Sequence, residues 1–137
     1  MGLIYAEIEL INAGDLELVR RGNMDKDEIR RTWATTLVDS GSYLLAINEN
    51  IQEVLQLSVI SKDRFELASG EIQELDVVGP VEVRFKNRST SCRALVLPGS
   101  AEPLLGSITL EGLDVLIDPA RQRLIPHPAH EVATFRL

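Results

Sequence analysis

The stretch Thr36-Leu37-Val38-Asp39-Ser40-Gly41-Ser42 decides how the rest of the chain is interpreted. Its apolar part, Leu37-Val38, is typical of a buried β-strand, because aliphatic and β-branched side chains pack well on a pleated surface. Gly41 permits a tight turn or a close backbone approach that a Cβ would block. The stretch therefore places the carboxylate of Asp39 at a rim where it is available for chemistry. Asp-Ser-Gly is also ordinary turn punctuation, so the surrounding chain has to decide.

Length and composition predict one domain, residues 1–137, built mainly from sheet. The chain has 137 residues, of which 45% are hydrophobic and 4% aromatic. That length suits a single globular core. Because aromatic side chains are scarce, Leu, Ile and Val must fill the core, and their β-branched members favour strands.

The net charge, the absence of targeting patterns and the cysteine count indicate which partners and which location to expect. The formal charge is −7, with 14 Lys and Arg against 21 Asp and Glu, and no basic block interrupts it, so we expect no nucleic-acid partner. No cationic leader, myristoylation pattern or apolar run of about 18 residues is present, so we expect no membrane association. Cys92 is the single cysteine, which fits a reducing, cytoplasmic location.

Alternating and β-branched runs predict many short strands, bounded by Gly, Pro and Asn. The predicted strands cover residues 3–11, 29–39, 43–47, 64–68, 71–75, 81–85, 91–97, 115–118, 123–125 and 132–136. Gly79-Pro80 is expected to interrupt the strand pattern, so that the next strand begins at residue 81. Strands at this spacing, with one or two short helices, predict a closed, barrel-like and mostly β fold.

Capping residues indicate where the helices begin. Asp15 is expected to cap residues 16–21, and either Asn48 or Asn50 to cap a helix carrying Ile51, Val54 and Leu55. Ser107 is expected to cap a helix whose apolar stripe is Ile108, Leu110 and Leu113. Residues 23–28 read as a polar connection.

The segments on either side of Ser69-Gly70 alternate in polarity, which predicts a β-hairpin with Gly70 supplying a positive φ. Such a hairpin is free to project from the domain and to move.

Together these features resemble a retropepsin-like aspartic protease, the one-lobed type found in retroviruses and in bacteria. Leu37-Val38-Asp39-Ser40-Gly41-Ser42 is similar to that family's active-site turn. Leu104-Leu105-Gly106 begins a helical pattern and ends 67 positions after Asp39, where the family has an apolar-apolar-Gly element. Ala68-Ser69-Gly70-Glu71 lies between them, where the family carries its flap. Val78-Gly79-Pro80-Val81 is closest in kind to the bacterial branch, and the resemblance covers residues 34–126.

The resemblance implies a peptidase that works as a homodimer, without a cofactor or metal. Peptide hydrolysis of this type needs two carboxylates that share one proton, and one chain supplies only Asp39. The resemblance gives Ser40 a hydrogen bond across the dimer axis and Gly41 a close approach to the substrate backbone. Ser42 is placed either to donate a hydrogen bond to Asp39 or to act as a simple turn hydroxyl. The substrate would be a peptide or protein.

Some residues depart from the viral pattern. Viral members usually carry an acid directly after the turn and an arginine directly after the later glycine, but this chain has Tyr43 and Ser107 there. Residues 12–31 form an insertion with no viral counterpart. The alternative is therefore a non-catalytic, dimeric interaction module that keeps the fold without turnover.

Other candidate groups carry weaker signals. His127 and His130 are three apart, which on a helix would suit a metal, but Pro126 and Pro128 disfavour a helix there. Cys92 lies in a strand pattern, where a half-buried thiol is the simpler interpretation than a nucleophile. Asp118 reads as a turn acid, and is the first candidate if both carboxylates came from one chain.

Overall fold

A computed structural model of the chain describes residues 2–130, and in them the protein is mostly β. The strands are β1 (Tyr5–Asn12), β2 (Arg31–Val38), β3 (Leu45–Asn48), β4 (Ser58–Glu66), β5 (Ile72–Phe85), β6 (Arg88–Leu97), β7 (Leu104–Leu105), β8 (Val115–Asp118) and β9 (Arg123–Pro126). The helices are α1 (Ala13–Arg20), α2 (Glu49–Leu55) and α3 (Ser107–Leu113), with 3₁₀ turns at Lys26–Glu28 and Pro128–His130. None of the helices in residues 2–130 is long and apolar enough to span a bilayer.

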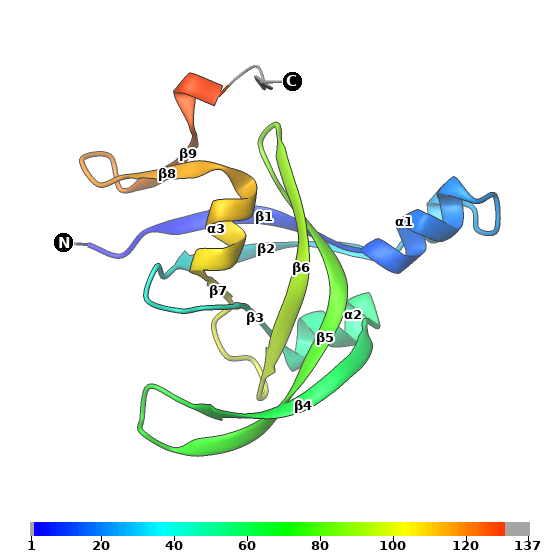
Figure 1. The fold of residues 1–137 in the computed structure, drawn as a ribbon, viewed down its shortest axis with the longest axis horizontal. Helices are drawn as coiled ribbons and strands as arrows, with labels where there is room; N and C mark the ends of the chain where they lie inside the picture. Colours follow the sequence, from blue (N-terminus) through cyan, green and yellow to red (C-terminus); the bar gives the residue numbers. More distant parts are fainter. Residues whose placement is uncertain (1, 131–137) are drawn as a thin grey trace, which may run out of the picture.

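Seven strands form one mixed sheet in the order β1-β2-β7-β3-β6-β5-β4, and β8 and β9 form a separate two-stranded sheet. The first strand of that order, β1, also pairs with β5 over Glu9–Asn12. Figure 1 shows the β4–β5 hairpin, in green, extending away from the strands that carry the two ends of the chain. The sheet therefore curves around one interior and sends a single long arm outward.

The main core lies between the curved strands and the helices. Alternate residues of β1 and β5 point into it, so that Ile8, Leu10, Val81 and Val83 are fully buried. A smaller apolar cluster sits at the base of the hairpin, formed by Ala46, Leu75, Val77 and Leu95. Aliphatic side chains make up most of both clusters, as the composition predicts, and Phe85 is the one aromatic residue among the described residues that are buried in the main core.

The predicted mostly β character is confirmed, but several details of the expected pattern are wrong. The chain has three short α-helices in residues 2–130, where one or two were expected. Gly79-Pro80 does not interrupt the strand, because β5 runs through it and absorbs the irregularity as a register shift opposite β6. Residues 58–63 are part of β4 although both faces are exposed there, which removes the alternation that marks a strand. The strand expected over 132–136 lies outside the described residues.

The insertion that follows β1 is held by an ion pair between the buried Asp15 and the exposed Arg30. Asn12, not Asp15, caps α1, since its side-chain oxygen accepts a hydrogen bond from the Asp15 N–H at 3.1 Å. Asp15 is only 2% exposed and accepts two bonds from the Arg30 guanidinium, at 2.9 and 2.8 Å, and one from the Arg30 N–H. These side-chain hydrogen bonds from Arg30 lower the pKa of Asp15. The clamp fixes both ends of the insertion beside the start of β2.

Candidate active site

Asp39 follows β2 directly, and hydrogen bonds hold both its backbone and its carboxylate. The Asp39 N–H donates to the Leu105 carbonyl at 3.0 Å, which continues the pairing of β2 with β7. One carboxylate oxygen accepts from the Gly41 N–H at 3.0 Å, and the other accepts from the Ser42 hydroxyl at 2.7 Å. Of the two alternatives that the sequence left open for Ser42, the structure has the hydrogen bond to Asp39. Two donors from the same turn fix the orientation of the carboxylate.

The Leu104-Leu105-Gly106 element supports this turn from the neighbouring strand. Leu104 pairs with Leu37 on one side and with Ala46 on the other, so that β7 sits between β2 and β3. Leu105 pairs with Val38 and is fully buried. The resemblance placed this element beside the active-site loop, and the strand pairing brings the two together.

Gly106 lies where no side chain fits. A Cβ at this position would lie 2.5 Å from the Leu44 carbonyl oxygen and 2.8 Å from that of Ser42. The close approach lets the Ser107 N–H donate to the Ser42 carbonyl at 2.8 Å. Ser107 was expected to cap α3, but the N-cap is Gly106 and no side chain caps the helix. The first turn of α3 is satisfied by the Asp39 turn instead.

A pocket of about 420 Å³ lies between the Asp39 turn and the hairpin. Asp39, Gly41 and Ser42 line one side of it. Phe65 and Ala68, from the hairpin arm after β4, line the opposite side. The remaining wall is apolar, and its members are Leu44, Ala46, Leu67, Leu95, Leu97 and Leu104. A carboxylate thus opens into an apolar pocket beneath a projecting hairpin.

The predicted site residues fall into two groups. The pocket is lined by Asp39, Gly41, Ser42, Ala68 and Leu104. It is not lined by the exposed Ser40, by the hairpin tip Ser69-Gly70-Glu71, or by Leu105 and Gly106. Gly70 has φ +85°, as a hairpin tip requires. Phe65, Leu95 and Leu97 were missed as site residues. Their alternation along β4 and β6 was the available signal, because it places the apolar side chains of each strand on one face.

Tyr43 and Ser107 are the two residues at which the sequence departs from the viral pattern that it resembles. The Tyr43 side chain is 72% exposed and lines the same pocket as Asp39. Its carbonyl accepts from the Ile108 N–H at 3.3 Å. These residues join the turn to α3 through backbone bonds rather than through charge.

Other carboxylates near the site are distinguishable from Asp39. Glu66 also lines the pocket, but it is an exposed residue at the end of β4. Asp118 belongs to the separate β8–β9 sheet and pairs with Arg121 at 3.2 Å and Arg123 at 3.6 Å. Burial alone would raise the pKa of Asp118, but the hydrogen bonds and charges of these arginines outweigh it and lower that pKa. Asp118 therefore forms ion pairs within the β8–β9 turn and is not part of the Asp39 pocket.

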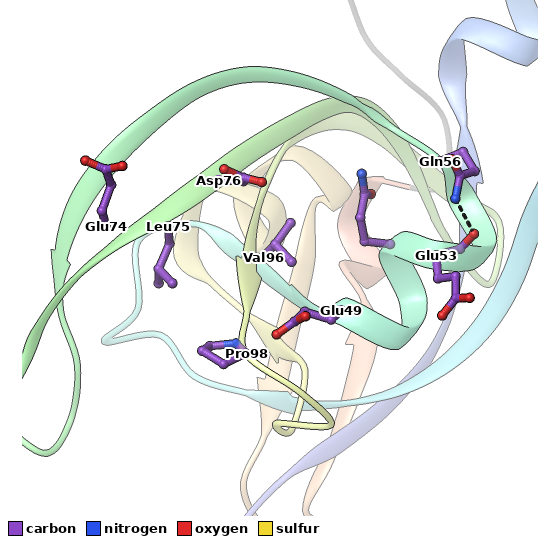
Figure 2. Close-up of a pocket in the computed structure, with 9 residues that line it drawn as sticks. Glu49, Glu53, Gln56, Glu74, Leu75, Asp76, Val96 and Pro98 are labelled. Carbon is purple, nitrogen blue, oxygen red and sulfur yellow. Dashed lines mark hydrogen bonds between the residues drawn. The ribbon is translucent and has the colours of Figure 1, made fainter.

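A second pocket, of about 460 Å³, contains none of the predicted site residues. It lies between α2 and the outer face of the stem of the hairpin, and Figure 2 shows Glu49 on the helix with Glu74 and Asp76 on β5 around it. Val96 and Pro98 complete its floor. The two pockets share no lining residue.

The remaining candidates are also apart from Asp39. The rings of His127 and His130 stack with centroids 3.8 Å apart, and His130 Nδ1 lies 2.7 Å from the Asp114 carboxylate. Residues 2–130 hold no group of three His, Cys, Asp or Glu side chains arranged for a metal. Cys92 is half-buried beside Thr109, and burial raises the pKa of its thiol.

A scan against protein-family models finds no match for this chain, and a search of curated proteins finds none either, so the functional proposal rests on the residues and geometry described above.

Proposed function

We propose that the protein is an aspartic endopeptidase of the retropepsin type, acting as a homodimer with one Asp39 from each chain. The observation that carries the proposal is the shared pocket. Asp39 and the hairpin arm at Phe65 and Ala68 line opposite sides of one apolar cavity, with the turn oriented by Gly41 and Ser42. A peptide held in that cavity would lie under the hairpin, against a fixed carboxylate.

The strand pairings support a one-lobed, barrel-like domain of that family. The bonds of β1 to both β2 and β5 connect six strands of the sheet in a cycle, from which the β4–β5 hairpin projects. The parallel placement of β7 against β2 brings the two halves of the domain together at Asp39. In a protease of this type, the projecting hairpin would serve as the flap and the turn at Asp39 as the active-site turn.

The chemistry requires a second carboxylate, which we assign to Asp39 of a second copy. Two carboxylates close together cannot both ionise easily, so the pair holds one proton. The ionised member takes a proton from water as the water oxygen attacks the peptide carbonyl, and the protonated member donates to the carbonyl oxygen. Collapse of the tetrahedral intermediate breaks the C–N bond, and the amine leaves with a proton from the pair. A twofold axis between the chains makes the two turns equivalent.

Peptidase assays on unfolded protein substrates, read by mass spectrometry, test the proposal between pH 4 and pH 7. Asp39→Asn should abolish cleavage, because an amide can neither share the proton nor deprotonate water. Glu66→Gln is the matched control, since it changes a carboxylate of the same pocket that the mechanism does not use. A hydroxyl-bearing transition-state inhibitor of aspartic proteases should block cleavage, and a chelator should not.

The outcomes separate the enzyme from its alternative. Full cleavage by the Asp39→Asn chain would refute the mechanism. A dimer that cleaves nothing under these conditions would instead support the non-catalytic interaction module. Loss of cleavage in Glu66→Gln, with Asp39→Asn unaffected, would move the chemistry to the hairpin.

A further inference from the structure

A groove of about 490 Å³ lies between the start of β1 and β9, with Trp33 on its wall. Three consecutive residues of β1, Tyr5, Ala6 and Glu7, line it, and so does the β9 run from Arg123 to Pro126. Successive side chains of a strand point to opposite faces. Consecutive residues can therefore share a groove only when the groove runs along the edge of the strand. This groove follows two strand edges.

Within residues 2–130, the β1 edge that faces the groove has no pairing strand beside Tyr5–Glu7. The Ile4 carbonyl accepts from the Val38 N–H at 2.8 Å, so the even-numbered residues of β1 bond to β2. The N–H and C=O groups of Tyr5 and Glu7 point the other way. On that side β5 pairs with β1 only from Glu9 onward. In the part of the chain that the structure describes, no strand pairs with this length of edge beside the groove.

The side chains of the groove indicate what would fit the edge. Tyr5, Trp33 and Phe85 line it, although the whole chain has only one Trp, two Tyr and three Phe. Lys86 and Arg123 line it as well, against the single acid Glu7. A net positive lining stands out in a chain whose formal charge is −7. Aromatic faces with cations suit apolar side chains interleaved with carboxylates.

We infer that this groove binds an extended peptide segment of a partner, with alternating apolar and acidic side chains, as a strand added to the β1 edge. The backbone of the segment bonds to Tyr5 and Glu7, which supplies affinity. Its apolar side chains cover Trp33 and Tyr5, and its carboxylates face Lys86 and Arg123. The groove shares no lining residue with the Asp39 pocket, so the inference is independent of the proposed peptidase activity.

Trp33 reports binding directly, because it is the single tryptophan and is 63% exposed on the wall of the groove. The probes are three blocked octapeptides. One alternates Val with Glu, the second alternates Val with Lys, and the third replaces every second Val of the first with Pro, which removes backbone donors. The Val-Glu peptide should shift Trp33 emission to shorter wavelength and saturate. The Val-Lys peptide should bind at least about tenfold more weakly, and the Pro peptide should give no shift.

Charge variants locate the binding. Lys86→Glu should weaken the binding of the Val-Glu peptide and strengthen the binding of the Val-Lys peptide. Lys26→Glu is the matched control, because it makes the same change in net charge in the 3₁₀ turn of the insertion, away from the groove. Equal effects of the two variants, or equal binding of the Pro peptide, would overturn the inference. A Trp33 response that appears only after residues 131–137 are removed would also overturn it, in favour of the chain's own residues as the occupant.

Discussion

Replacement of Gly106 by Ala tests whether the contact between α3 and the Asp39 turn is as tight as the geometry indicates. Gly106 has φ −89° and ψ 177°, an extended conformation that alanine adopts without strain. The alanine Cβ would instead meet the carbonyl oxygens of Leu44 and Ser42, at 2.5 and 2.8 Å. Both neighbours are backbone atoms, so the clash is relieved only when the helix and the turn separate.

The cost can be worked from those contacts. Separation weakens the bonds from Ser107 N–H to Ser42 and from Ile108 N–H to Tyr43, each worth about 1 kcal/mol. Overpacking adds about 1–3 kcal/mol, and the lower entropy of the unfolded alanine chain returns roughly 0.4–1 kcal/mol. We expect the free energy of unfolding to fall by about 3 kcal/mol.

Chemical denaturation of the variant and wild type measures the loss. Gly22→Ala is the control, because Gly22 has φ +74° with open space around it, and its cost of about 1–2 kcal/mol comes from conformation alone. A loss below about 1 kcal/mol for Gly106→Ala would show that the two segments are not in rigid contact. If the variant folds, its peptidase activity should fall further than that of Gly22→Ala, since Ser42 orients Asp39.

Three further predictions concern the dyad, the hairpin and the insertion. When wild-type chains are mixed with Asp39→Asn chains and allowed to exchange, activity at half mutant should fall to about one quarter, whereas a linear fall would mean that each chain works alone. Gly70→Val should lower turnover more than stability, because Val disfavours the positive φ at the hairpin tip, and unchanged turnover would remove its role as a flap. Asp15→Asn should cost about 2 kcal/mol at pH 7. Folding lowers the pKa of Asp15, so the ionised carboxylate stabilises the folded state fully above its unfolded pKa near 4. This stabilisation is lost as the pH falls through the folded-state pKa. The denaturation curves of the variant and wild type should therefore converge in acid.

The sequence predicted the parts of the fold that depend on local pattern. Alternation marked β1 and the hairpin strands, and the choice between Asn48 and Asn50 as a cap was resolved because Asn48 accepts the Ile51 N–H at 2.9 Å. The turn at Asp39 was also predicted, and the bond from Ser42 was one of the two alternatives left open for that residue.

The errors arise where a distant residue overrides local preference. Asp15 has the residue type of a cap, but Arg30 draws it into a partly buried ion pair and Asn12 takes its place. Ser107 likewise has the type of a cap, yet it is the first residue of the helix, and its N–H donates to the Ser42 carbonyl. The alternation along β6 indicates that Leu95 and Leu97 share a face, but it does not indicate that this face meets the Asp39 turn, because that depends on how β3 and β7 place the sheet.

The support of the Asp39 turn by Leu105 and Gly106 has a consequence for the order of events during translation. The turn is synthesised early, but the carbonyl that accepts the Asp39 N–H and the helix that packs on Ser42 are made in the last third of the chain. At roughly 5–20 residues per second, several seconds separate the two on the ribosome. A nascent chain that carries Asp39 would therefore lack the folded Asp39 turn until nearly all of the domain has emerged.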